Sequence, residues 1–78
     1  MREVIFDEKL SWKAKGLYIF LYENNQEEIS LEKICDFSRD GRESTRSARN
    51  ELIKMGYLKT KTIRENGLIT GSKWILKR

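Results

Sequence analysis

The chain is 78 residues long, with 16 Lys and Arg against 12 Asp and Glu, and it contains no His, no Pro and one Cys. This length supports one small domain, and the longest apolar run, 17–22, is far shorter than the ~20 residues that span a bilayer. Without His, the Ser-His and Cys-His catalytic pairs and the Cys/His zinc sites are excluded. We therefore expect no enzyme, no membrane protein, and no metal or cofactor. The lone Cys35 allows no internal disulfide, which favours the cytoplasm.

Charge is distributed unevenly along the chain. Residues 1–38 hold five basic and eight acidic residues, a net charge of −3, whereas residues 39–78 hold eleven basic and four acidic residues, a net charge of +7. Such an asymmetry predicts a polyanionic partner, of which nucleic acid is the commonest. The alternative is a solvated basic surface without a partner.

The first predicted elements are an arm and a helix. Residues 1–9, with β-prone 4–6, form either a short edge strand or a packed arm. Ser11 is a good N-cap for a helix over 11–24, which ends at the turn-forming pair Asn24-Asn25. The buried face of this helix is predicted from the spacing i, i+3, i+4, i+7 of Ala14, Leu17, Tyr18 and Leu21.

Two further helices follow. A short helix is expected over 30–37, with its first residue as the N-cap. A third helix is expected over 41–55, where Asp40 and Glu43 have the spacing of a capping box and Gly56 provides a left-handed stop.

The period then changes from helix to strand. Residues 57–77 alternate like a β-hairpin, and Asn66-Gly67 is the strongest short turn signal. Trp74 is expected to pack the hairpin against the helices. A short helix, a Gly-containing turn, a longer helix and a hairpin predict an α+β winged helix-turn-helix domain over 1–78, with three helices and the hairpin as its wing.

The helix over 41–55 is the predicted recognition helix, because an α-helix fits the major groove of DNA. Its core face consists of Thr45, Ala48, Leu52 and Met55. Arg46 and Asn50 lie opposite, one turn apart, and favour guanine and adenine respectively. The alternative is a solvated face with Glu43–Arg46 and Arg46–Asn50 pairs. The predicted DNA-binding residues of this helix and the preceding turn are Arg39, Arg42, Arg46, Ser47, Asn50 and Lys54.

The wing supplies a second predicted set of phosphate contacts, with Lys59 and Lys61 on one face by the strand period of two. The full set is Lys59, Lys61, Arg64, Asn66 and Lys73. Arg49 borders the apolar stripe of the recognition helix. Either its stem lies along the core edge while the guanidinium reaches a phosphate, or it pairs with an acid of the first helix.

The run 17–22 places apolar side chains all around the helix, so a second side of this helix must also be buried against another element or partner. Either Ile19, Phe20 and Tyr22 receive the N-terminal arm and the return strand, or they form a homodimer contact.

Leu10–Leu17 resembles the L-S-x-K-A-K-G-L opening of a winged-helix domain found in phage and plasmid replication proteins and small regulators of Gram-positive bacteria. The resemblance continues at Ile29-Ser30, Gly41-Arg42, Arg46–Ala48, Glu51-Leu52, Gly56–Leu58 and Asn66-Gly67. It implies a sequence-specific double-stranded DNA-binding protein of the bacterial cytoplasm, acting in transcription or replication initiation, with Arg42, Arg46 and Ser47 facing the groove. Thr45 and Arg49 depart from the aliphatic residues usual there. The rival function is a protein-interaction module that binds a host replication or transcription factor.

Overall fold

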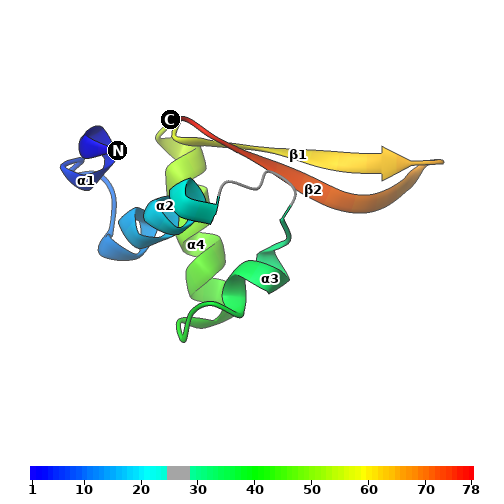
Figure 1. Cartoon of the computed structure of the whole chain (residues 1–78), viewed down its shortest axis with the longest axis horizontal. Helices are drawn as coiled ribbons and strands as arrows, with labels where there is room; N and C mark the ends of the chain where they lie inside the picture. Colours follow the sequence, from blue (N-terminus) through cyan, green and yellow to red (C-terminus); the bar gives the residue numbers. More distant parts are fainter. Residues whose placement is uncertain (25–28) are drawn as a thin grey trace.

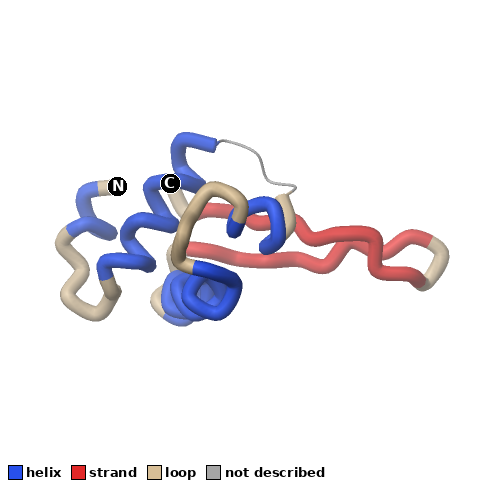
Figure 2. Tube along the Cα trace, turned by 90° about the horizontal axis from the view of Figure 1, so that it is seen from below, coloured by secondary structure: helices blue, strands red, loops and turns tan. Residues whose placement is uncertain are grey.

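The computed structural model describes residues 1–24 and 29–78, which form an α+β fold (Figure 1). The described helices are α1 (Arg2–Ile5), α2 (Trp12–Asn24), α3 (Leu31–Cys35) and α4 (Gly41–Lys54), and the strands of the antiparallel hairpin are β1 (Leu58–Glu65) and β2 (Leu68–Leu76). The helices gather at one end as a helical body. The hairpin projects from it, so that the molecule measures 42 × 25 × 20 Å (Figure 2).

The core lies where α2 crosses α4 and the base of the hairpin closes over them. The predicted stripe of α2 is confirmed, because Ala14, Leu17, Tyr18 and Leu21 are all buried. On α4 the predicted face is buried at Thr45, Ala48 and Leu52, while Met55 is half-buried at the helix end. Leu58 and Trp74 extend this core into the hairpin, which confirms the packing role expected for Trp74.

The N-terminal segment forms a helical turn, so of the two alternatives for residues 1–9 the packed arm is confirmed and the edge strand is wrong. The Met1 carbonyl accepts from the backbone N–H groups of Val4 and Ile5, and Val4 is buried in the core. The described sheet contains only β1 and β2. Because a strand without a partner leaves its backbone groups unpaired, local helical hydrogen bonds are the better solution for this packed arm.

Two predicted N-caps are confirmed and one is wrong. The Ser11 hydroxyl accepts from the Ala14 backbone N–H at 3.2 Å, and the Ser30 hydroxyl accepts from that of Lys33 at 3.1 Å. The side chain of Asp40 makes no such bond. Asp40 has right-handed helical backbone angles and precedes Gly41 at φ +81°, whereas a capping residue needs an extended backbone. The predicted capping box is therefore absent.

Helix ends and the hairpin turn follow the glycine pattern. Gly56 has φ +83°, and the Tyr57 backbone N–H donates to the Leu52 carbonyl at 2.9 Å, which closes α4. Asn66 and Gly67 have φ of 52° and 79°, the positive pair of a type I′ turn. Helix α2 is described as far as Asn24, and the predicted stop at Asn24-Asn25 reaches beyond the described residues.

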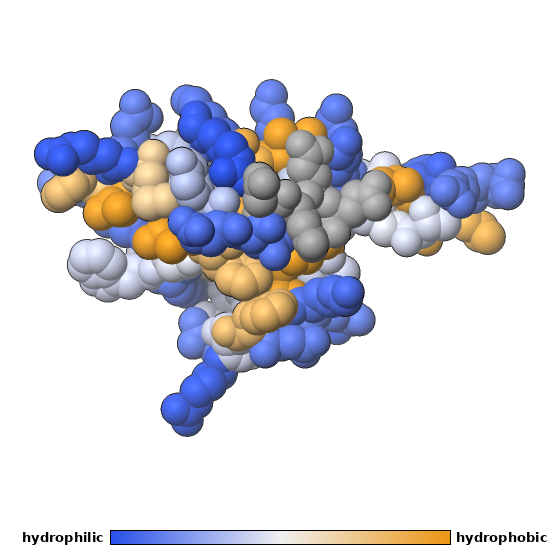
Figure 3. All heavy atoms as spheres, viewed as in Figure 1, coloured by the Kyte–Doolittle hydropathy of each residue, from blue (hydrophilic) through white to orange (hydrophobic). Residues whose placement is uncertain are grey.

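The outer part of the hairpin differs from its base. All residues from 64 to 71 are exposed, and a β-bulge lies between the Ile63↔Gly71 and Arg64↔Ile69 pairs. Figure 3 shows hydrophobic surface at the far end of the hairpin beside hydrophilic side chains. This end makes no contribution to the buried core.

Candidate nucleic-acid interface

The outward face of α4 is polar and uncovered within the described part of the chain. Because Thr45, Ala48 and Leu52 turn inward, the helix presents its opposite side to solvent. That side carries the predicted contacts Arg42, Ser47, Asn50 and Lys54, which are exposed, and Arg46, which is partly exposed. Arg39 is exposed in the turn before α4. A helix displayed in this way can enter a groove about 12 Å wide, the width of the major groove.

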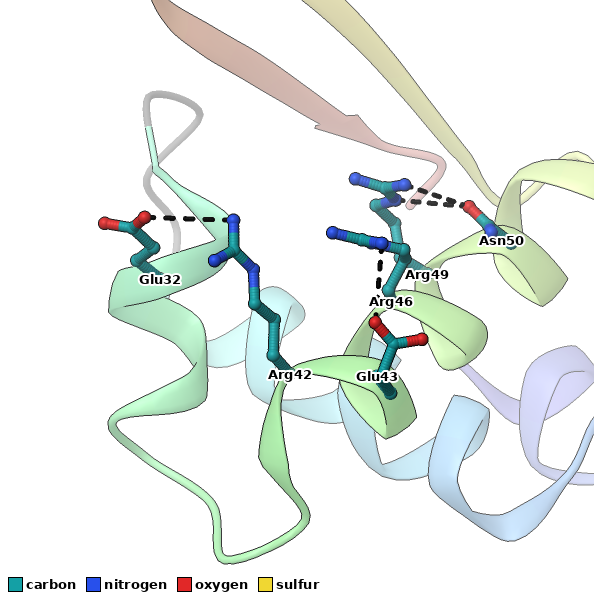
Figure 4. Close-up of polar contacts among 6 residues, drawn as sticks. All are labelled: Glu32, Arg42, Glu43, Arg46, Arg49 and Asn50. Carbon is teal, nitrogen blue, oxygen red and sulfur yellow. Dashed lines mark hydrogen bonds and ion pairs between the residues drawn. The ribbon is translucent and has the colours of Figure 1, made fainter.

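Two arginines of this face form exposed ion pairs. An Arg42 guanidinium nitrogen lies 3.8 Å from a Glu32 carboxylate oxygen on α3, and Arg46 lies 3.5 Å from Glu43 (Figure 4). The Glu43–Arg46 pair is the one expected for a solvated helix face. Such exposed pairs contribute only about 0–1 kcal/mol, so a phosphate or a guanine can displace either acid at small cost.

Arg49 connects α4 to the hairpin. Its Nε and Nη2 donate to Asn50 Oδ1 at 3.3 and 3.1 Å (Figure 4). Its guanidinium carbon lies 5.9 Å from the centre of the Trp74 ring. An ion pair between Arg49 and an acid of α2 is not seen among the described residues. The acceptor oxygen that Asn50 would use to read adenine is therefore engaged by Arg49, which places Arg49 within the candidate site.

Lys13 joins this surface from α2, although the sequence places it in the acidic half. Its Nζ donates to the Ser47 hydroxyl at 3.1 Å. The contact joins residues 34 positions apart, and no local pattern indicates it. It adds a cation to the Ser47 end of the α4 face.

A carboxylate locks α2 against α4 beside this contact. Glu51 accepts from the Ser11 backbone N–H at 2.8 Å and from the Ser11 hydroxyl at 2.6 Å. These two hydrogen bonds hold the pKa of Glu51 below its ordinary value. Because the first turn of α2 is fixed in this way, Lys13 is carried to Ser47.

The hairpin divides its basic residues between two faces. Lys61 pairs with Lys73 across the ladder and Lys59 lies two positions away, so these three share one face, as predicted for Lys59 and Lys61. Arg64 lies on the opposite face, which also carries the buried side chains of Leu58 and Trp74 at the base of the hairpin. Asn66 occupies the turn itself. The structure thus separates the predicted hairpin contacts into a lysine face and an arginine at the tip.

An apolar groove lies beside the α4 face. It has a volume of about 440 Å³ and is lined by Trp12, Leu17 and Phe20 of α2, by Ile34 and Phe37, and by Ala48 of α4, among others. Trp12 is 83% exposed and Phe37 69% exposed, and Phe37 packs against Phe20 at 5.1 Å between ring centres. Large exposed aromatic side chains around a hollow are typical of a binding surface.

No protein-family model matches the chain, and neither the curated proteins nor the solved structures give a match. The described residues contain no cluster of three or more His, Cys, Asp or Glu side chains that could hold a metal ion. None of the described helices is long and apolar enough to cross a membrane. The family resemblance seen in the sequence therefore stays a prediction.

Proposed function

We propose that the chain is a winged helix-turn-helix domain that binds double-stranded DNA sequence-specifically. In this proposal α3 and α4 form the helix-turn-helix, α4 enters the major groove, and the hairpin is the wing that contacts adjacent phosphates. The observation that carries the proposal is the outward face of α4, where Arg46 and Asn50 lie one turn apart opposite a buried face. The role is occupancy of a regulatory or replication-origin site in the bacterial cytoplasm.

The test is a salt-titrated binding series on random duplex DNA, followed by selection of bound sequences. Arg46→Ala/Asn50→Ala should weaken binding to the selected sequence more than to random DNA, because base contacts specify while phosphate contacts do not. Arg2→Ala is the matched control, since α1 lies at the end of the molecule opposite the hairpin tip (Figure 1). Absence of binding near 50 mM salt, roughly where non-specific affinity is strong, would overturn the proposal.

The apolar groove supports a second candidate function, a module that binds a host replication or transcription protein. Exposed Trp12 and Phe37 are the side chains that such a partner would cover. The two candidates separate cleanly, because Trp12→Ala should leave DNA affinity unchanged if only α4 and the hairpin bind DNA.

We also propose a homodimer through residues 17–22, although fewer of their side chains are accessible than the sequence indicated. Leu17, Tyr18 and Leu21 belong to the core, and the Arg78 guanidinium lies 4.8 Å from the centre of the Tyr22 ring. Ile19 and part of Phe20 remain accessible. Sedimentation equilibrium tests this contact: a monomer mass that does not change with concentration would contradict it.

A further inference from the structure

The tip of the hairpin carries an apolar pair that the fold itself does not use. We define the hairpin tip as residues 64–69. Leu68 is 70% exposed and Ile69 67% exposed, directly after the Asn66-Gly67 turn. Successive residues of a strand point to opposite faces, so no register could bury both side chains against one core. Exposed apolar residues on a two-stranded hairpin are an aggregation liability, and a partner is the physical reason to keep them there.

From this geometry we infer that the hairpin tip is an apolar wedge that enters the minor groove of duplex DNA and partly unstacks a base step. The inference rests on the proposed DNA-binding function and specifies the ligand of the hairpin. Leu and Ile are among the side chains that unstack bases in this way, and the resulting kink brings more DNA onto the protein.

Charge complementarity selects an anionic partner. The strands carry four basic residues, Lys59, Lys61, Arg64 and Lys73, against one acid, Glu65. Lys61 stands opposite Lys73 and lies four residues before Glu65, so this pair is about 13 Å from the end of the strand at the turn, at ~3.3 Å per residue. The minor groove is about 7.5 Å deep. With the tip at the floor of the groove, Lys61 and Lys73 lie just outside its rim, where their long side chains can contact the phosphates.

The register also distinguishes the two apolar residues. Ile69 is paired with Arg64, whereas Leu68 is paired with Glu65. The Arg64 guanidinium beside Ile69 attracts the phosphates that border a stack of bases. The Glu65 carboxylate beside Leu68 repels those phosphates. Ile69 is therefore the principal wedge and Leu68 the secondary one.

The experiment measures bending and unstacking separately from affinity. A duplex of about 30 base pairs, carrying the sequence selected by the wild-type chain, is labelled with an energy-transfer pair at its ends and with 2-aminopurine at the step nearest the tip. Wild-type protein should raise both the transfer efficiency and the 2-aminopurine fluorescence. Ile69→Thr should lose most of both signals with about tenfold weaker binding, and Leu68→Thr should lose less. Threonine keeps the strand propensity at either position.

Lys61→Ala is the matched control. It should weaken binding and lower the salt slope by about one, yet retain the bend in the DNA that is still bound. If the wild-type chain binds the selected duplex and Ile69→Thr/Leu68→Thr bends it equally, the wedge is disproved and the proposed function stands. If the wild-type chain binds no duplex, the proposed function fails as well. Tip-dependent sedimentation with vesicles of phosphatidylserine and phosphatidylcholine, without DNA bending, would assign the tip to a membrane surface instead.

Discussion

The helical body and the hairpin tip differ in what determines their side chains. In the body, Leu52 and Tyr18 are almost fully buried, and polar groups such as Glu51 are engaged by hydrogen bonds from another element. At the tip every residue is exposed, including the apolar side chains of Leu68 and Ile69, and all of their neighbours within the tip are exposed as well. Packing therefore explains the sequence of the body but not that of the tip, for which we propose a DNA partner.

The core of the body should be the most sensitive region. Leu52→Ala removes a side chain with no exposed surface and should lower the free energy of unfolding by about 2–5 kcal/mol. That is a large fraction of the roughly 4–12 kcal/mol expected for 78 residues. Its sequence neighbour Ile53, 38% exposed, is the matched control, and Ile53→Ala should cost about 0.5 kcal/mol. Urea denaturation measures both, and similar losses would contradict the assigned core face.

The two regions should respond oppositely to the same glycine substitution. Gly67 has φ +79°, so Gly67→Ala should destabilise the hairpin by about 1–2 kcal/mol. Gly16 lies inside α2, and an added Cβ there would meet no atom within 4 Å. Gly16→Ala should therefore stabilise the protein by about 0.5–1 kcal/mol through its helix propensity. Thermal unfolding of the two variants compares them directly.

The contact between Ser11 and Glu51 should make the body sensitive to acid. The pKa of Glu51 is lowered by the hydroxyl and backbone N–H of Ser11, so its contribution is present above about pH 4.5 and is lost as the pH falls through the folded pKa. Glu51→Gln should cost about 1 kcal/mol at pH 7, limited by solvent screening. The variant should also lose stability less steeply than the wild type below pH 4.5; parallel acid titrations would refute this.

A smaller effect is expected at alkaline pH. Tyr57 donates its hydroxyl to Asp7 at 2.7 Å, which raises the pKa of Tyr57 to about 12 and lowers that of Asp7. The protonated phenol is thus favoured by folding, and its contribution should disappear as the pH rises from 10 towards 12. Tyr57→Phe should lower the melting temperature modestly at pH 7 and remove part of the alkaline loss. Tyr22→Phe is the control.

The smallest stability change is expected at the hairpin tip. Ile69→Thr should change the free energy of unfolding by no more than about 0.5 kcal/mol, because the side chain has little buried area to lose. Circular dichroism during thermal unfolding measures it. A loss of unfolding free energy comparable to that of Leu52→Ala would show that the tip packs on the body, which would contradict the difference between the two regions.

Much of the secondary structure follows from local chemistry. The stripe on α2, the inward face of α4, the stop at Gly56 and the Asn66-Gly67 turn depend on residues close in sequence, where side-chain period and backbone preference act alone. Predictions from neighbouring residues were wrong where a segment could satisfy its backbone hydrogen bonds in more than one way. The segment 1–9 was compatible with a strand, and Asp40 with a cap, until Gly41 and the packing of Val4 set the backbone.

The candidate site divides in the same way. The sequence by itself determined that α4 would turn Arg46 and Asn50 away from the core, since a buried face at helical spacing leaves only the opposite side for polar residues. Only the tertiary structure decided that Lys13 meets Ser47, that Arg49 lies between Asn50 and Trp74, and that Glu51 accepts hydrogen bonds from Ser11, the N-cap of α2. These contacts join residues 25 or more positions apart, except Arg49–Asn50, and their geometry depends on how the helices and the hairpin cross.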